Sequence, residues 1–266
     1  MSKKKKTSNF KFLRIAILLF VLAAIWNHFE NQKTVVKNWN GTQDVVITPI
    51  NFDGQESTHK GIDKLHESQF EEINDYLDKQ AKQFGLKLGK SVRIRLGNTI
   101  TSIPPAIPKI GSSRMDIIIW SLKLRWWAWR NKTTDSHATQ INLFVMYSSP
   151  KPRQRLPHST GLQKGLIGLI HADANPKNRK RNNMIITHEL LHIFGASDKY
   201  VLTNGRPIFP DGFAKPNQSN PFPQSKAEIM AGSIPLSPNK IGRVFSLSQT
   251  VIGEKTAQEI GWIKKI

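Results

Sequence analysis

Residues 188–198 read HELLHIFGASD, and this stretch restricts the fold and chemistry of the chain more than any other. On an α-helix, residues four positions apart lie on one face, so the imidazoles of His188 and His192 can bind one metal ion. HExxH on a helix is typical of zinc sites in which the glutamate is the general base. The sequence therefore predicts a Zn²⁺ site with His188 and His192 as ligands and Glu189 as the catalytic residue.

The residues around this motif favour a buried helix. Apolar side chains occupy both sides of the expected helix, as a helix in the centre of a domain requires. The alternative interpretation is a core helix whose two histidines are only hydrogen-bonded. The apolar residues are Met184, Ile185, Ile186, Leu190, Leu191, Ile193 and Phe194.

A catalytic zinc ion usually has three protein ligands and one water molecule, so a third ligand is needed. In one arrangement, Gly195 ends the helix in a left-handed turn, and the chain doubles back to bring Asp198 to the metal. In the other, a carboxylate from a later segment, Glu228, completes the set. The sequence leaves both arrangements open.

The stretch resembles the metzincin zinc-peptidase signature HExxHxxGxxH, with Asp198 where the third histidine stands. An aspartate at this position is similar to the snapalysin-type branch of that clan. The chain also resembles a group of uncharacterised bacterial membrane-anchored proteins with an HELLH…GASDKY arrangement. The metzincin resemblance implies a zinc metallopeptidase in which a mixed sheet lies over the active-site helix.

A second stretch, AEIMAGS at residues 227–233, resembles the Met-turn beneath the metal in metzincins. The resemblance implies that Met230 forms the floor of the site and is not a ligand, whereas the alternative is a core methionine beside a turn. The tyrosine that some metzincins place shortly after this methionine is absent, because residue 232 is glycine. Tyr200 could instead reach the site and polarise a carbonyl, or pack as an ordinary tyrosine.

Residues 1–26 have the features of a membrane-targeting segment, because cationic residues precede an apolar run at 15–26. No small-x-small cleavage site follows, which favours an uncleaved signal anchor over a removed signal peptide. Since the cationic tip stays in the cytoplasm, the rest of a single-pass protein of a bacterial cell membrane would lie in the periplasm or outside the cell. Residues 27–44 are expected to form a linker, and residues 45–266 the metallopeptidase-like catalytic domain.

Hydrophobic periodicity in that domain predicts an α+β fold. The order of the expected strands and helices suits the metzincin arrangement, in which a mixed sheet lies over the active-site helix and a Met-turn and a C-terminal helix follow. Residues 165–170 would then be the edge strand. An extended peptide could pair with such an edge. Strands are expected at residues 45–50, 92–96, 141–147 and 165–171, and helices at 65–84, at 115–130, through the zinc motif and near the C-terminus.

The chain of 266 residues has a formal net charge of +20 and no cysteine. Thiolate ligands and disulfides are therefore excluded, and anionic partners such as anionic lipid or a cell-wall polymer are favoured. A nucleic-acid partner is not expected, because no nucleic-acid-binding signature is present. The basic run at 177–181 could guide an acidic substrate or form a solvated loop. The Lys, Arg and Trp residues at 123–130 could lie on lipid headgroups or pack in the body.

We expect a zinc peptidase that cleaves an extracytoplasmic protein or peptide. Zinc would polarise the scissile carbonyl while Glu189 takes a proton from the attacking water. Two alternatives remain: a zinc hydrolase of cell-wall peptide, and a basic binding protein with a structural metal site. Outside the motif, His171 is the histidine most suited to line the cleft.

Overall fold

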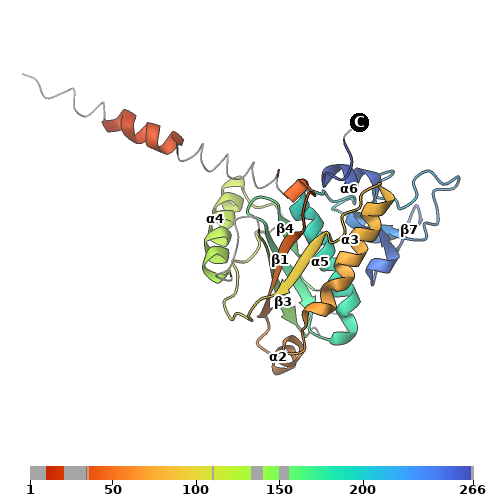
Figure 1. Cartoon of the computed structure of the whole chain (residues 1–266), viewed down its shortest axis with the longest axis horizontal. Coiled ribbons are helices and arrows are strands. Elements are labelled where there is room, and N and C mark those ends of the chain that lie inside the picture. The colour runs from red at the N-terminus through yellow and green to blue at the C-terminus, as the bar shows by residue number, and fades with distance from the viewer. Residues whose placement is uncertain are drawn as a thin grey trace, which may run out of the picture.

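A five-stranded sheet forms the centre of the computed structural model, which describes residues 10–20, 34, 36–109, 111–132, 140–149 and 156–264 (Figure 1). The strand order is β2-β1-β3-β5-β4, in which only β4 runs antiparallel to its neighbour. The expected combination of helices with a mixed sheet is therefore confirmed, in a mixed α/β fold whose sheet is mostly parallel. The strands are β1 (Gln43–Asn51), β2 (Val92–Leu96), β3 (Ile141–Ser148), β4 (Thr160–Leu162) and β5 (Ile167–Asp173).

Both faces of the sheet are covered, because the central strands are apolar on both sides. Alternate residues of β3 enter two separate cores, Leu143 and Val145 on one face and Phe144 and Met146 on the other. Helices α3 and α5 cover the first face, and α4 covers the second (Figure 1). The helices are α2 (Glu56–Ile62), α3 (Glu71–Gln83), α4 (Arg114–Asn131), α5 (Arg179–Phe194) and α6 (Glu254–Glu259).

The C-terminal part of the chain consists of short elements beside α5. A single 3-10 turn, η3, lies within the stretch predicted as a Met-turn, and the expected C-terminal helix is α6. These elements are β6 (Ala227–Glu228), η3 (Ile229–Ala231), β7 (Ser233–Ser237), β8 (Lys240–Arg243) and β9 (Thr250–Val251).

The prediction that residues 165–170 form the edge strand of the sheet is wrong. β5 covers most of the segment predicted as the edge, but it lies between β3 and β4. The edge strand next to β5 is β4, which has only three residues, too few to give an alternating apolar pattern. The expected helix at 65–84 is also divided, into a 3-10 turn at Glu67–Phe70 and α3.

The packed body begins within the segment predicted as a linker. Val36 is fully buried, and the ring of Trp39 lies 4.6 Å from that of Phe194. The indole N–H of Trp39 donates to the carbonyl of Ile260 over 2.7 Å. The folded part therefore starts before residue 45. Val36 and Trp39 already pack in the body, and β1 begins at Gln43.

Part of the expected signal anchor, residues 1–9 and 21–26, lies outside the described residues. Residues 10–20 are helical. Within the part of the chain that the structure describes, no helix combines the length and the apolar character needed to cross a membrane.

Candidate metal centre

Helix α5 carries the two histidines of the motif on one face, as predicted. The Nε2 atoms of His188 and His192 lie 3.2 Å apart, and their rings are nearly perpendicular, at 84°. Because both nitrogens are directed at the same point, the two rings could bind one metal ion. α5 starts at Arg179, so residues 179–181 of the basic run form its first turn and not a loop.

Gly195 ends α5 in the predicted left-handed conformation, with φ of 105°. This backbone conformation favours glycine, because side chains with a Cβ rarely adopt it. The chain then turns back, and Oδ1 of Asp198 lies 3.3 Å from Nε2 of His188 and 3.2 Å from Nε2 of His192. The structure brings Asp198 to the two histidines, and these three residues form a group that could hold a metal ion.

Glu228, the alternative third ligand, lies in a different environment. It is fully buried, and Oε2 accepts hydrogen bonds from the backbone N–H groups of Met230, at 2.6 Å, and Ala231, at 3.1 Å. Oε1 accepts from the N–H of Gly253 and from the hydroxyl of Thr256. Glu228 therefore caps η3 and ties it to α6, and its oxygens are already used.

The hydrogen bonds of the Nδ1 atoms of His188 and His192 determine whether the Nε2 atoms carry a proton. Nδ1 of His188 lies 3.0 Å from the carbonyl oxygen of Ile229, and Nδ1 of His192 lies 2.8 Å from that of Ala196. A carbonyl only accepts, so each neutral ring carries its proton on Nδ1 and presents a bare lone pair on Nε2. Two such lone pairs and a carboxylate oxygen repel one another unless a cation lies between them. The donor set fits a metal ion.

Protons can partly replace that cation. Burial alone would lower the pKa of His188, but the hydrogen bond with Asp198 and the charge of Glu189 raise it to about 9. Burial alone would raise the pKa of Asp198, but the contacts with His188 and His192 hold it well below its usual value. Metal ions and protons would therefore compete for the same three residues.

Glu189 lies beside this group on the same helix. Its side chain is 5 % exposed, and burial raises the pKa of its carboxyl group. Oε2 is buried and has no hydrogen-bond partner among the described residues. A buried carboxylate oxygen without a partner is costly to folding, which is typical of a functional group and not of a structural one.

Met230 and Tyr200 both lie near the centre. Met230 is fully buried in η3, and its carbonyl accepts the backbone N–H of Lys199 over 3.0 Å. Tyr200 lines the cleft that opens in front of His188. Burial and the nearby charges of Asp198 and Glu189 raise the pKa of Tyr200 to about 12, so its hydroxyl keeps its proton at neutral pH.

A buried ion pair that sequence reasoning missed holds the loop of Asp198. Nζ of Lys199 lies 2.6 Å from Oε2 of Glu259 and donates to the carbonyl and hydroxyl of Ser197. Glu259 in turn accepts from the N–H and hydroxyl of Ser197. Because Glu259 lies on α6, some 60 residues further along the chain, no local pattern could have paired it with this loop.

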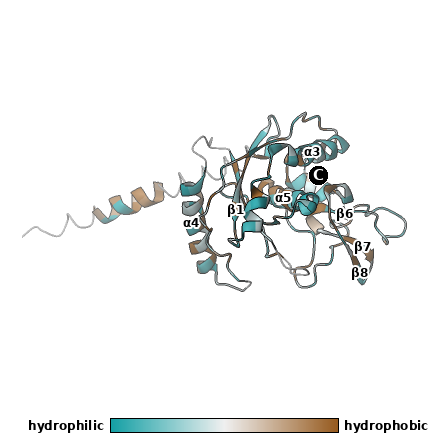
Figure 2. Ribbon diagram, turned by 90° about the horizontal axis from the view of Figure 1, so that it is seen from below, coloured by the Kyte–Doolittle hydropathy of each residue, from teal (hydrophilic) through white to brown (hydrophobic). Residues whose placement is uncertain are grey.

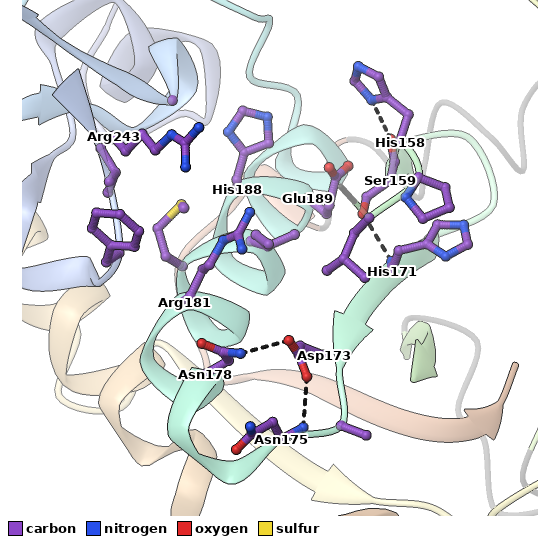
Figure 3. A pocket seen from close by; sticks show the side chains of 18 of the residues that line it. His158, Ser159, His171, Asp173, Asn175, Asn178, Arg181, His188, Glu189 and Arg243 are labelled. Atoms are coloured by element: carbon purple, nitrogen blue, oxygen red, sulfur yellow. Dashed lines mark hydrogen bonds between the residues drawn. The ribbon is translucent and has the colours of Figure 1, made fainter. Parts of the chain in front are cut away.

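A cleft of about 1680 Å³ opens in front of His188 and Glu189. His171 lines it, as expected, and its ring packs edge-on against that of Phe52, 5.0 Å away. Figure 3 shows Arg181 from α5 and Arg243 from β8 reaching towards the side of the cleft where His188 lies. Lys60 and Lys64 also line the cleft, so its cationic side chains outnumber its two acidic ones, Asp173 and Glu189.

The edge strand β4 packs closely on α5. A Cβ at Gly161 would lie 2.3 Å from the carbonyl oxygen of Glu189 and 2.9 Å from Cβ of His192, so only glycine allows this approach. A smaller hollow of about 390 Å³ lies on the His192 side, lined by Gly161 and Leu162. His188 thus lines the large cleft, and His192 lines the small hollow.

Comparison with known proteins adds no family assignment. No model of a known protein family matches the chain, and no curated protein matches it either.

Proposed function

We propose that this protein is a metal-dependent hydrolase, most specifically a zinc peptidase of the metzincin type. The observation that carries the proposal is the convergence of His188, His192 and Asp198 on one point. Beside it lies Glu189, whose Oε2 has no hydrogen-bond partner within the described part of the chain. A structural metal site needs no such carboxylate, because structural zinc sites are closed by four protein ligands.

The ligand set favours zinc. Two imidazole nitrogens and one carboxylate oxygen are ligands that Zn²⁺ accepts, and three protein ligands leave one position for the reaction. The carbonyl contacts of Ile229 and Ala196 would orient the rings and raise their basicity. When bound, zinc supplies Lewis-acid polarisation of a carbonyl group and of water.

Glu189 would move the proton in this mechanism. Its raised pKa allows the carboxylate to accept a proton from attacking water and to donate it to the leaving amine. Tyr200 keeps its hydroxyl proton and could donate a hydrogen bond to the oxygen that gains negative charge. Met230 would form the apolar floor, as the resemblance to the Met-turn implies.

An extended peptide fits the surroundings of the site. Among the described residues, β4 is an edge strand that pairs only with β5, which favours the addition of an extended strand at its other side. The cleft lined by His188 and the hollow lined by His192 would hold side chains before and after the cleaved bond. In line with the basic and apolar N-terminal sequence, we propose that the body works outside the cytoplasmic membrane of a bacterium.

Zinc content and cleavage test this function together. The purified full chain should bind one zinc ion and cleave a peptide library, and a chelator should abolish cleavage. Glu189→Gln should retain the zinc and lose turnover by several orders of magnitude, because it keeps the shape but not the base. Zinc binding without any cleavage would favour a basic binding protein with a structural metal.

A second candidate is the hydrolysis of cell-wall peptide, which the cationic walls of the cleft favour. Arg181 and Arg243 form no ion pair within the described residues, so they are available for carboxylates of a substrate. Cleavage of purified peptidoglycan in preference to casein would support this candidate. Arg181→Gln with Arg243→Gln should then reduce kcat/KM for acidic substrates and leave neutral peptides unaffected.

A further inference from the structure

Helix α4 has one face in the core and a second apolar face in solvent. Leu124, Trp127 and Ala128 are buried against β3 and β5, and the ring of Trp127 lies 4.6 Å from that of Phe144. The indole N–H groups of Trp120 and Trp127 donate to Pro105 and Ser102. This face explains why the helix packs on the sheet, but it accounts for only part of its apolar residues.

Six of the remaining apolar residues form a stripe on the opposite side of α4. Their spacing of three, one, three, four and three positions keeps them within an arc of about 100° at 3.6 residues per turn. All are between 45 and 66 % exposed, so no described segment of the chain covers them. We call these residues the α4 stripe: Met115, Ile118, Ile119, Leu122, Trp126 and Trp129.

Cationic residues flank the α4 stripe on both sides. By the same helical spacing, Lys123 and Arg130 lie along one edge, and Arg114 and Lys132 lie along the other. None of these four forms an ion pair within the described part of the chain. The guanidinium group of Arg130 lies over the ring of Trp126, 5.0 Å from its centroid.

The single acidic residue of α4 is used elsewhere. Asp116 forms a capping box with Ser113 at the start of the helix, so it does not neutralise the cations along the stripe. In both views α4 lies on the outer flank of the body, and part of its ribbon has the colour of hydrophobic residues in Figure 2. An exposed apolar face of this size marks an interaction surface.

From this geometry we infer that the α4 stripe lies in the interface of an anionic lipid bilayer. A helix that rests on a bilayer has an apolar face between cationic borders, with tryptophans at the level of the headgroups. The long cationic side chains can extend to the phosphates while the apolar residues enter the acyl boundary. This inference is independent of the proposed function, because it uses no residue of the metal centre.

A second copy of the chain fits the α4 stripe less well. In a symmetric dimer the same patch faces itself, so the cationic borders of one copy would lie against those of the other. Like charges at close range oppose such an association. An anionic surface has the opposite charge and therefore complements both borders at once.

The absence of cysteine makes the test direct. Leu122→Cys gives a single attachment point for a nitroxide in the stripe. Leu202→Cys, at a residue that is 80 % exposed and outside α4, is the matched control. Each labelled full chain is reconstituted with vesicles of phosphatidylcholine alone or mixed with phosphatidylglycerol. Collision of the nitroxide with oxygen and with a water-soluble nickel reagent is then measured.

We expect a several-fold loss of nickel collision and a gain of oxygen collision at position 122 in the anionic vesicles, with no change at position 202. Lys123→Glu with Arg130→Glu should remove this effect, whereas the exposed control pair Lys87→Glu with Lys90→Glu should not. Equal nickel access at positions 122 and 202 would overturn the inference. So would protection at position 122 without vesicles, accompanied by spin–spin broadening, which would identify a contact between copies. Protection that survives the charge reversal would overturn the role of anionic lipid.

Discussion

The ammonium group of Lys199 lies 2.6 Å from the carboxylate of Glu259, in a pair that is almost entirely buried on the lysine side. Lys199 follows Asp198 directly, and Ser197 before it is hydrogen-bonded to the same carboxylate. The loop that brings Asp198 to the histidines is therefore fixed by α6. The contact with Lys199 also lowers the pKa of Glu259, although burial alone would raise it.

Glu259→Gln should weaken zinc binding by about tenfold, because the residue orients the loop of a ligand without contacting the metal. Zinc affinity measured by competition with a chromophoric chelator checks this. Glu254→Gln, an exposed change on the same helix, is the matched control and should bind zinc normally. Equal affinities in both variants would show that α6 does not position Asp198.

The choice of third ligand predicts opposite results for two carboxylates. Asp198→Ala should lose zinc and keep its fold, since Asp198 serves the metal group. Glu228→Gln should keep zinc but unfold more easily, by about 1–3 kcal/mol, because one oxygen that accepts buried N–H or O–H groups becomes a donor. Metal analysis and denaturant unfolding separate the two effects. Undiminished zinc in Asp198→Ala would be inconsistent with our assignment.

The close contact of β4 with α5 predicts that any side chain at Gly161 lowers the stability of the protein. Gly161→Ala places a methyl group against the backbone of Glu189 and the Cβ of His192, so the strand or the helix must move. We expect a loss of about 1–3 kcal/mol in the free energy of unfolding, together with weaker zinc binding. Gly41→Ala, where a Cβ meets no atom within 4 Å, is the control and should be neutral.

His171 predicts a loss of stability in acid. Burial lowers its pKa in the folded chain to about 4, against 6.5 in the unfolded chain. Between these two pH values the unfolded state binds more protons than the folded state does. The free energy of unfolding is therefore highest, as far as His171 is concerned, above pH 6.5, and it falls as the pH is lowered towards 4. The effect is at most about 3 kcal/mol. Unfolding measured from pH 4 to 7 should show a flatter profile in His171→Gln, and an identical slope would refute the buried neutral histidine.

Local patterns in the sequence predicted the site better than its surroundings. The four-residue spacing of His188 and His192 and the glycine at 195 follow from helix geometry, and the structure places both as expected. The parallel strands were predictable because β1, β3 and β5 are rich in apolar residues and β2 alternates apolar and charged residues. β4 was not, because three residues carry no period and its place depends on close packing of Gly161 against α5.

Contacts between distant segments were beyond any local pattern. Glu228 seemed a possible ligand because it is a carboxylate after the motif, but its oxygens are used by η3 and α6. The exposed stripe of α4 shows the same limit. Its apolar residues alone predict a helix, and only the structure separates the face in the core from the face in solvent.

Anomalous diffraction at the zinc edge, from crystals of the full chain grown with zinc, tests the central claim most directly. We predict one strong peak within about 2.0–2.2 Å of Nε2 of His188, Nε2 of His192 and a carboxylate oxygen of Asp198. Glu189 should lie beside the peak without coordinating it. A peak elsewhere, or zinc-saturated crystals with no peak between these three residues, would contradict the metal centre and the hydrolase proposed from it.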